Sequence, residues 1–153
     1  MTRLETLRRC RASLAIFIAG LVLSGLTAFP LLREVRLLCA WAGPYPWLDT
    51  VRGGLEATYA AYPWLAYGTD WLAFAHLAIA VFFIGPLIDP ARNRWILVSG
   101  IIACAAVVPT ALIAGAVRGI PMYWRLIDCS FGVFGAIPLI YCLRLSMRLD
   151  EPI

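Results

Sequence analysis

Four stretches of this sequence, each about 20 residues long, are almost wholly apolar. They run over residues 13–32, 71–88, 95–117 and 122–143. Roughly 20 residues of α-helix cross a hydrocarbon core of about 30 Å, so each stretch has the length of a transmembrane helix. Two of these stretches contain ionisable groups. His76 lies in the second, and Arg125 and Asp128 lie in the fourth. The sequence therefore predicts an all-α polytopic membrane protein, a four-helix transmembrane bundle forming one membrane domain over 1–153.

The composition supports lipid as the surrounding solvent. Apolar residues make up 62% of the chain and charged residues 14%, and the mean hydropathy is +0.82. So few charges cannot cover the surface of a water-soluble fold, whereas lipid needs no such cover. The net charge of +4 comes from arginines scattered along the segment ends. They form no basic stripe, so the expected partners are the lipid bilayer and other membrane protein chains, including a second copy, and no nucleic acid.

The arginines also predict an orientation. With the N-terminus inside, eight of the thirteen face the cytoplasm, four face outward and Arg125 is left in the membrane. The excess on one side predicts a multi-pass protein of the cell inner membrane with both termini cytoplasmic. The first apolar stretch is longer than the apolar region of a signal peptide and lacks a small-x-small cleavage site, so we expect it to be retained as a helix.

The segment 33–68, between the first two stretches, is rich in aromatic residues. It is expected outside the membrane, and Gly43-Pro44 and Gly53-Gly54 interrupt it. Tryptophan and tyrosine at this density are typical of the headgroup region of a bilayer. We expect one or two short interfacial helices here. The aromatic residues are Trp41, Tyr45, Trp47, Tyr59, Tyr62, Trp64 and Tyr67.

The five cysteines show no C-x-x-C spacing, and most lie in or beside apolar segments. The sequence therefore predicts neither a disulfide scaffold nor a metal site, and it favours buried cysteines that behave as small apolar side chains.

Ionisable and polar groups of three segments fall at one depth. His76 and Asp128 each lie seven residues after the outer interface, which we expect near Thr69 for the second segment and near Pro121 for the fourth. Both are therefore expected roughly 10 Å below the outer interface. Thr110 is expected at about the same height, and Arg125 lies one turn before Asp128. Because charged groups are costly in a membrane, these residues and Asp70 are candidates for a ligand or proton site, with His76 and Asp128 able to form a relay.

A structural interpretation of the same residues is also open. Asp128 could pair with Arg125, and His76 could make one hydrogen bond between helices. Thr69 would then be the N-cap of the second helix, with Asp70 placed favourably at the positive end of the helix dipole.

Two strings, Tyr67–His76 and Arg125–Gly135, resemble segments of an uncharacterised family of short bacterial four-helix membrane proteins, over about the last ninety residues. The resemblance implies a bacterial inner-membrane protein in which Asp70, His76, Arg125 and Asp128 are notable residues. It implies no activity.

The sequence offers few residues arranged for catalysis. A bis-histidine haem needs two histidines and the chain has one, and no hydrolase spacing or glycine-rich nucleotide loop is present. Catalytic residues are unknown and no cofactor is expected. We therefore predict a non-enzymatic protein that binds or senses a small polar or lipophilic ligand at the outer-side polar layer, or that serves as a subunit of a membrane assembly. The alternatives are a small oligomeric proton-coupled transporter and an accessory subunit or enzyme of quinone or lipid chemistry.

Overall fold

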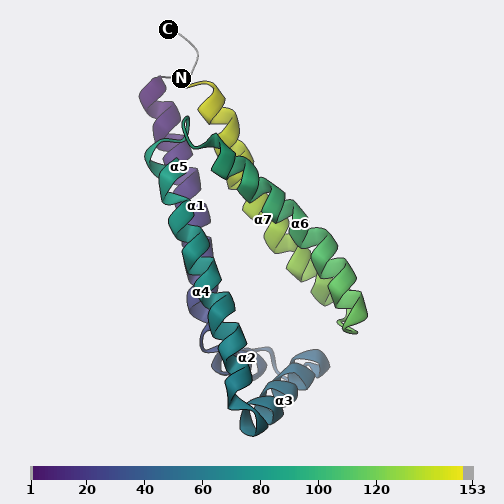
Figure 1. Cartoon of the computed structure of the whole chain (residues 1–153). Helices are drawn as coiled ribbons and strands as arrows, with labels where there is room; N and C mark the ends of the chain where they lie inside the picture. Colours follow the sequence, from purple (N-terminus) through teal and green to yellow (C-terminus); the bar gives the residue numbers. More distant parts are fainter. Residues whose placement is uncertain (1, 150–153) are drawn as a thin grey trace. The chain divides into compact units, whose positions relative to one another are not determined.

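The computed structural model describes residues 2–149, and these residues form helices and no strands (Figure 1). One short 3₁₀ helix, η1, covers Pro63–Leu65. The α-helices are α1 (Arg3–Ala28), α2 (Leu31–Ala42), α3 (Pro46–Ala61), α4 (Ala66–Phe82), α5 (Ile84–Ile88), α6 (Arg94–Val117) and α7 (Met122–Met147).

Four helical segments are long and apolar enough to cross a membrane. They are Arg3–Ala28, Pro63–Ile88, Arg94–Val117 and Met122–Met147. Large apolar side chains such as Ile113 and Phe131 are exposed along them, as expected for helices whose outer faces contact lipid. The predicted all-α, multi-pass membrane fold is confirmed.

The chain divides into two compact units. Unit 1 contains the residues up to Ala19 and from Val81 onward, and unit 2 contains Gly20–Ala80. Helices α1 and α4 both run through the boundary between the units. The single membrane domain predicted for 1–153 therefore stays a prediction.

Helix α1 begins at Arg3, ten residues before the predicted boundary, because a capping box precedes it. The backbone N–H of Glu5 donates to Thr2 Oγ1 over 3.2 Å, and the N–H of Thr2 donates to Glu5 Oε2 over 2.9 Å. These reciprocal bonds satisfy two backbone donors at the helix start. The helix ends at Ala28, earlier than the predicted 32, and Pro30 lies in the break before α2.

The second predicted helix also differs at its start and in its interior. The helical segment begins at Pro63 and not at residue 71, and it is interrupted at Phe83. Pro86 has no N–H to donate to the carbonyl of Phe82, so one helical hydrogen bond is missing at this interruption. Pro109 and Pro138 lie inside α6 and α7 without ending them.

The aromatic segment 33–68 is mostly helical, and the expectation of short helices is confirmed by α2 and α3. An ion pair joins them, with Arg36 Nε 2.8 Å from Glu56 Oε1. Val35 and Cys39 of α2 and Leu48 of α3 are buried, whereas Trp41 is exposed. That these helices lie along the outer membrane surface stays a prediction.

Helices α6 and α7 pack side by side in unit 1 (Figure 1). Glycines permit the close approach. A Cβ atom at Gly132 would overlap the carbonyl oxygen of Cys104 and lie 3.0 Å from Cβ of Val107. Small residues let helix backbones meet in lipid, where apolar burial alone supplies little drive.

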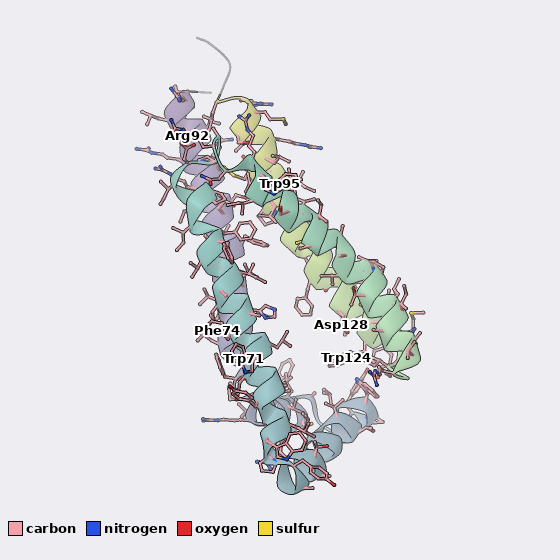
Figure 2. All side chains as sticks on the ribbon, viewed as in Figure 1. Trp71, Phe74, Arg92, Trp95, Trp124 and Asp128 are labelled. Carbon is pink, nitrogen blue, oxygen red and sulfur yellow. A yellow bond between two sulfur atoms is a disulfide. The ribbon has the colours of Figure 1, made fainter. Side chains whose placement is uncertain are left out.

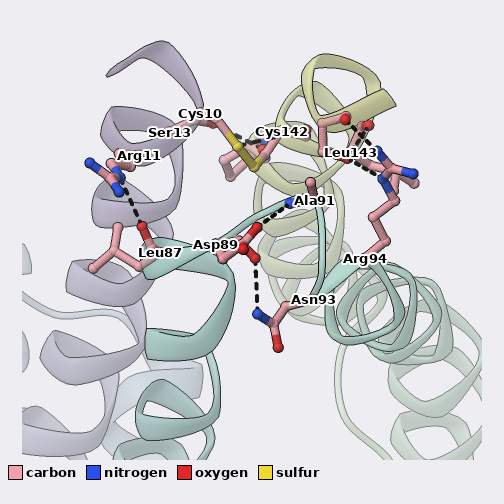
Figure 3. Close-up of a disulfide and its surroundings, with 12 residues drawn as sticks. Cys10, Arg11, Ser13, Leu87, Asp89, Ala91, Asn93, Arg94, Cys142 and Leu143 are labelled. Atoms are coloured by element: carbon pink, nitrogen blue, oxygen red, sulfur yellow. Dashed lines mark hydrogen bonds between the residues drawn. A yellow bond between two sulfur atoms is a disulfide. The ribbon is translucent and has the colours of Figure 1, made fainter. Parts of the chain in front are cut away.

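One end of unit 1 is cross-linked by polar groups and by a disulfide (Figure 3). Arg11 donates to the carbonyls of Leu87 and Ile88 at the end of α5, over 3.1 and 2.9 Å. Arg94 donates to Ser146 Oγ over 3.2 Å near the end of α7. The last carbonyls of a helix have no partner inside it, so Arg11 satisfies groups that α5 leaves open. Arg94 also donates to the carbonyl of Ser146, which accepts the N–H of Leu149 as well.

The disulfide joins Cys10 of α1 to Cys142 of α7, with their Cα atoms 4.6 Å apart (Figure 3). The expectation that all cysteines act as small apolar residues is wrong for this pair. The two residues are 132 positions apart, so only the packing of α1 on α7 brings them together. Cys39 and Cys129 are buried and free, as expected.

The close packing at Gly132 predicts a steric effect on stability. Gly132→Ala should lower the free energy of unfolding by about 1–3 kcal/mol, because the added methyl meets a backbone carbonyl that cannot rotate away. The control is Gly20→Ala, where nothing lies within 4 Å of the added Cβ. Thermal unfolding in detergent compares the two variants. Equal melting temperatures for Gly132→Ala and the wild type would contradict this packing.

The disulfide predicts a thiol count. The three free cysteines are Cys39, Cys104 and Cys129, so maleimide labelling of the SDS-unfolded, air-oxidised protein should add three labels without reductant and five with it. In Cys10→Ser the bond cannot form, and we expect four labels under both conditions. Mass spectrometry reads the number of labels. Five labels on the wild type without reductant would show that Cys10 and Cys142 remain thiols.

Candidate ligand-binding sites

The five predicted site residues divide between the two units. Asp70 and His76 lie on α4 in unit 2, whereas Thr110 on α6 and Arg125 and Asp128 on α7 lie in unit 1. His76 and Asp128 belong to different units, so the relay between them stays a prediction.

Thr110 and Asp128 line one open groove of about 560 Å³ along α6 and α7. Figure 2 labels Asp128 on this pair of helices. The groove exists because α6 presents small side chains at intervals of three and four residues, which leave room beside α7. Its other lining residues are Ala103, Ala106, Val107, Ala111, Ala114, Gly115, Arg118 and Ile120.

Asp128 and Arg118 are the two charged groups that line this groove, and no hydrogen bond or ion pair joins them within residues 2–149. Asp128 is half-buried, and within residues 2–149 its carboxylate accepts no hydrogen bond and forms no ion pair. A carboxylate in a membrane-spanning helix is costly unless it is paired, hydrated or neutralised. Asp128 is therefore suited to bind a hydrogen-bond donor or a cation that enters the groove.

Arg125 does not pair with Asp128. Its Nε donates to the carbonyl of Ile120 over 2.7 Å, and Nη1 lies 3.5 Å from the carbonyl of Leu112. Its side chain crosses directly over Gly115, where an added Cβ would lie 2.7 Å from Cδ. The expected ion pair is thus replaced by bonds that hold the backbone of the α6–α7 turn.

The turn itself has a geometry that requires glycine. Gly119 adopts a φ of +70°, and the N–H of Ile120 donates to the carbonyl of Gly115 over 2.9 Å. This is the Schellman arrangement that ends many helices, with glycine in the left-handed conformation. It presents the carbonyl of Ile120 to Arg125.

The hydroxyl of Thr110 donates to the carbonyl of Ala106 in its own helix, over 2.7 Å. Its donor is therefore used locally, and the oxygen can still accept one bond from a ligand in the groove.

His76 also bonds within its own helix. Its Nδ1 is 2.8 Å from the carbonyl of Leu72, so Nδ1 carries the hydrogen and Nε2 is left as an acceptor. The interhelical bond considered from the sequence is not formed at Nδ1. His76 lines neither of the two hollows described here.

Thr69 is not the N-cap of the second spanning helix, because α4 already begins at Ala66. The Thr69 hydroxyl donates to the carbonyl of Ala66 over 2.7 Å and lies 3.5 Å from the hydroxyl of Tyr59 on α3.

Asp70 lines a second hollow, of about 270 Å³, in unit 2. The other lining residues are aromatic: Phe29, Tyr67, Trp71 and Phe74. Sequence reasoning placed Tyr67 among the interfacial aromatic residues of 33–68 and missed its grouping with the other three. The signal was present in the spacing, since Tyr67, Trp71 and Phe74 recur at four and three residues and so share one face of a helix.

Within residues 2–149, no group of three or more histidine, cysteine, aspartate or glutamate residues could hold a metal ion. The fold defines the chain as an all-α, multi-pass membrane protein. No protein-family model, curated protein or solved structure matches it. The resemblance to short bacterial membrane proteins therefore stays a prediction.

The separate roles of Arg125 and Asp128 predict additive mutational effects. Arg125→Met keeps the chain over Gly115 but removes the bond to Ile120, which should cost about 1.5–3 kcal/mol. Asp128→Asn should change stability little. In the double variant, the coupling free energy should lie within about 0.5 kcal/mol of zero. Denaturant unfolding of the wild type, the two single variants and the double variant measures the coupling free energy. A value well above about 0.5 kcal/mol would show that Arg125 and Asp128 form an ion pair after all.

Proposed function

We propose that this chain is a non-enzymatic membrane protein that binds a small lipophilic molecule in the α6–α7 groove. The ligand's polar head donates a hydrogen bond to Asp128. The observation that carries the proposal is the half-buried carboxylate of Asp128, which has no partner within residues 2–149. The groove is otherwise lined by four alanines and by Val107, Thr110, Gly115, Arg118 and Ile120.

The chemistry of the lining favours binding over catalysis. Arg125 is held by the backbone of the turn, and the donor of Thr110 is held by Ala106. Asp128 therefore has no neighbouring acid or base held against it of the kind that general acid–base catalysis uses. The groove is open along two spanning helices, which suits a molecule that partitions into the bilayer before it binds.

A second function uses the same face. Ala103, Ala106, Thr110 and Ala114 are exposed along one side of α6, and small residues at this spacing allow a helix of another chain to approach closely. The protein would then be a subunit of a membrane assembly, and a donor from the partner helix would satisfy Asp128.

The proposed location is a bacterial inner membrane with both termini in the cytoplasm. The resemblance to short bacterial proteins and the excess of arginine at one side of the membrane support it. Arg11, Arg92 and Arg94 belong to the cytoplasmic set, and Arg11 and Arg94 satisfy helix ends there.

Native mass spectrometry of the protein, extracted from the membrane in a mild detergent, tests the function. We expect a small molecule or defined lipid bound to the wild type and lost from Asp128→Asn. Ala114→Leu should also lose it, because the larger side chain fills the groove.

The matched controls make the same two substitutions, Asp→Asn and Ala→Leu, at positions outside the groove. Asp49→Asn removes a carboxylate that pairs with Arg52 on α3, and Ala105→Leu adds the same bulk to an exposed site of α6 outside the groove. Both should keep the ligand. A second protein chain lost from Ala114→Leu would support the subunit function, and equal ligand retention in all variants would overturn the binding site.

A further inference from the structure

The aromatic residues of the open hollow in unit 2 contact one another at nearly right angles. Trp71 forms a T-shaped pair with Tyr67, with ring centroids 5.9 Å apart and an interplanar angle of 84°. Trp71 forms a second T-shaped pair with Phe74, at 5.8 Å and 89°. Phe29, from the link between α1 and α2, and Asp70 complete the lining. Figure 2 labels Trp71 and Phe74 on α4.

We propose that Phe29, Tyr67, Trp71 and Phe74, together with Asp70, form a binding site for a quaternary ammonium group. Aromatic ring faces carry partial negative charge and attract cations, and cages of several rings are the usual receptors for methylated ammonium ions. Asp70 supplies the counter-charge. It is the one ionic side chain of the lining, so the site selects a cation and disfavours an anion.

The nearly apolar lining selects the kind of cation. A primary ammonium group has three N–H donors, which need acceptors when water is removed. Besides the phenol oxygen of Tyr67, only Asp70 offers side-chain acceptors. A trimethylammonium group has no N–H to satisfy, and its methyl groups pack against ring faces without loss of hydrogen bonds.

The structural role expected for Asp70 does not account for its position. Helix α4 begins at Ala66, so Asp70 lies beyond the first turn, where the favourable effect of the helix dipole falls off. Within residues 2–149 its carboxylate forms no hydrogen bond or ion pair. The carboxylate beside the rings is therefore available to a ligand.

The same head group occurs in two sources, namely phosphatidylcholine in the bilayer and small solutes such as choline. The cluster lies in the first half of the spanning segment Pro63–Ile88 and is open, so a lipid head or a solute can reach it. The experiment therefore needs one arm for each source. The site is independent of the α6–α7 groove, so its failure leaves the proposed function standing.

The solute arm measures equilibrium binding of radiolabelled choline to the protein in phosphatidylglycerol nanodiscs, which contain no quaternary ammonium lipid. We expect saturable binding that tetramethylammonium displaces and ethanolamine displaces poorly. The lipid arm uses nanodiscs of equal phosphatidylcholine and phosphatidylglycerol, with native mass spectrometry of the lipids that the released protein retains. Preferential retention of phosphatidylcholine is the expected result there.

Asp70→Asn and Trp71→Leu should each weaken binding at least about five-fold. Asp70→Asn removes no hydrogen bond or ion pair seen within residues 2–149. It therefore still tests the site if Trp71→Leu fails to fold. The matched controls are Asp49→Asn and Trp41→Leu. Trp41 is 86% exposed and Trp71 is 56% exposed, and Trp41 does not line the hollow. Neither control should change binding.

Choline binding identifies a site for solutes, and retained phosphatidylcholine without choline binding identifies a site for lipid heads. Both support the proposal when Asp70→Asn and Trp71→Leu reduce the signal. Equal displacement by ethanolamine, equal signals in variants and controls, or no signal in either arm would overturn it.

Discussion

A backbone in lipid must satisfy its own polar groups, and this requirement explains more of the structure than any pairing of charges. Helices satisfy their interior, but each leaves carbonyls open at its end. Arginine adds donors at these places: Arg11 bonds the end of α5, Arg94 bonds the end of α7, and Arg125 bonds the α6–α7 turn. The number of arginines on each side predicts the topology, and three of them also bond helix ends or turns.

This use of arginine explains which features the sequence could predict. Length and hydropathy located all four spans, and α6 differs from its predicted range of 95–117 by one residue. The grouping of Thr110 with Asp128 followed from helix rise alone, and both line one groove. The role of Arg125 could not be predicted in this way, because its acceptor is a backbone carbonyl that looks the same at every position. The early start of α1 was predictable in principle from Thr2 and Glu5, whose spacing is that of a capping box.

The disulfide and the arginines favour opposite orientations of the chain in the membrane. The arginine excess predicts cytoplasmic N- and C-terminal ends, whereas disulfides persist mainly in oxidising compartments. Cys10 and Cys142 are both 0% exposed, and thiol exchange requires direct attack on a sulfur atom. A reductant therefore reaches this pair only when α1 separates from α7. Because the pair is buried, the disulfide would be reduced slowly even if both termini face the cytoplasm. The disulfide alone therefore does not contradict the orientation that the arginines favour.

Asp70 and Asp128 show how surroundings decide what one functional group can bind. Each carboxylate lies in a spanning segment without a partner within residues 2–149. Beside Asp128 most side chains are small, so the volume of the groove is available to a ligand. Arg118 lines the same groove but forms no ion pair with Asp128 within residues 2–149, so a ligand or another chain can supply the donor. Beside Asp70 the side chains are large rings whose faces already favour positive charge, and a cation without N–H groups fits there at least cost. Asp70 and Asp128 carry the same functional group but suit different ligands, because their neighbouring residues differ.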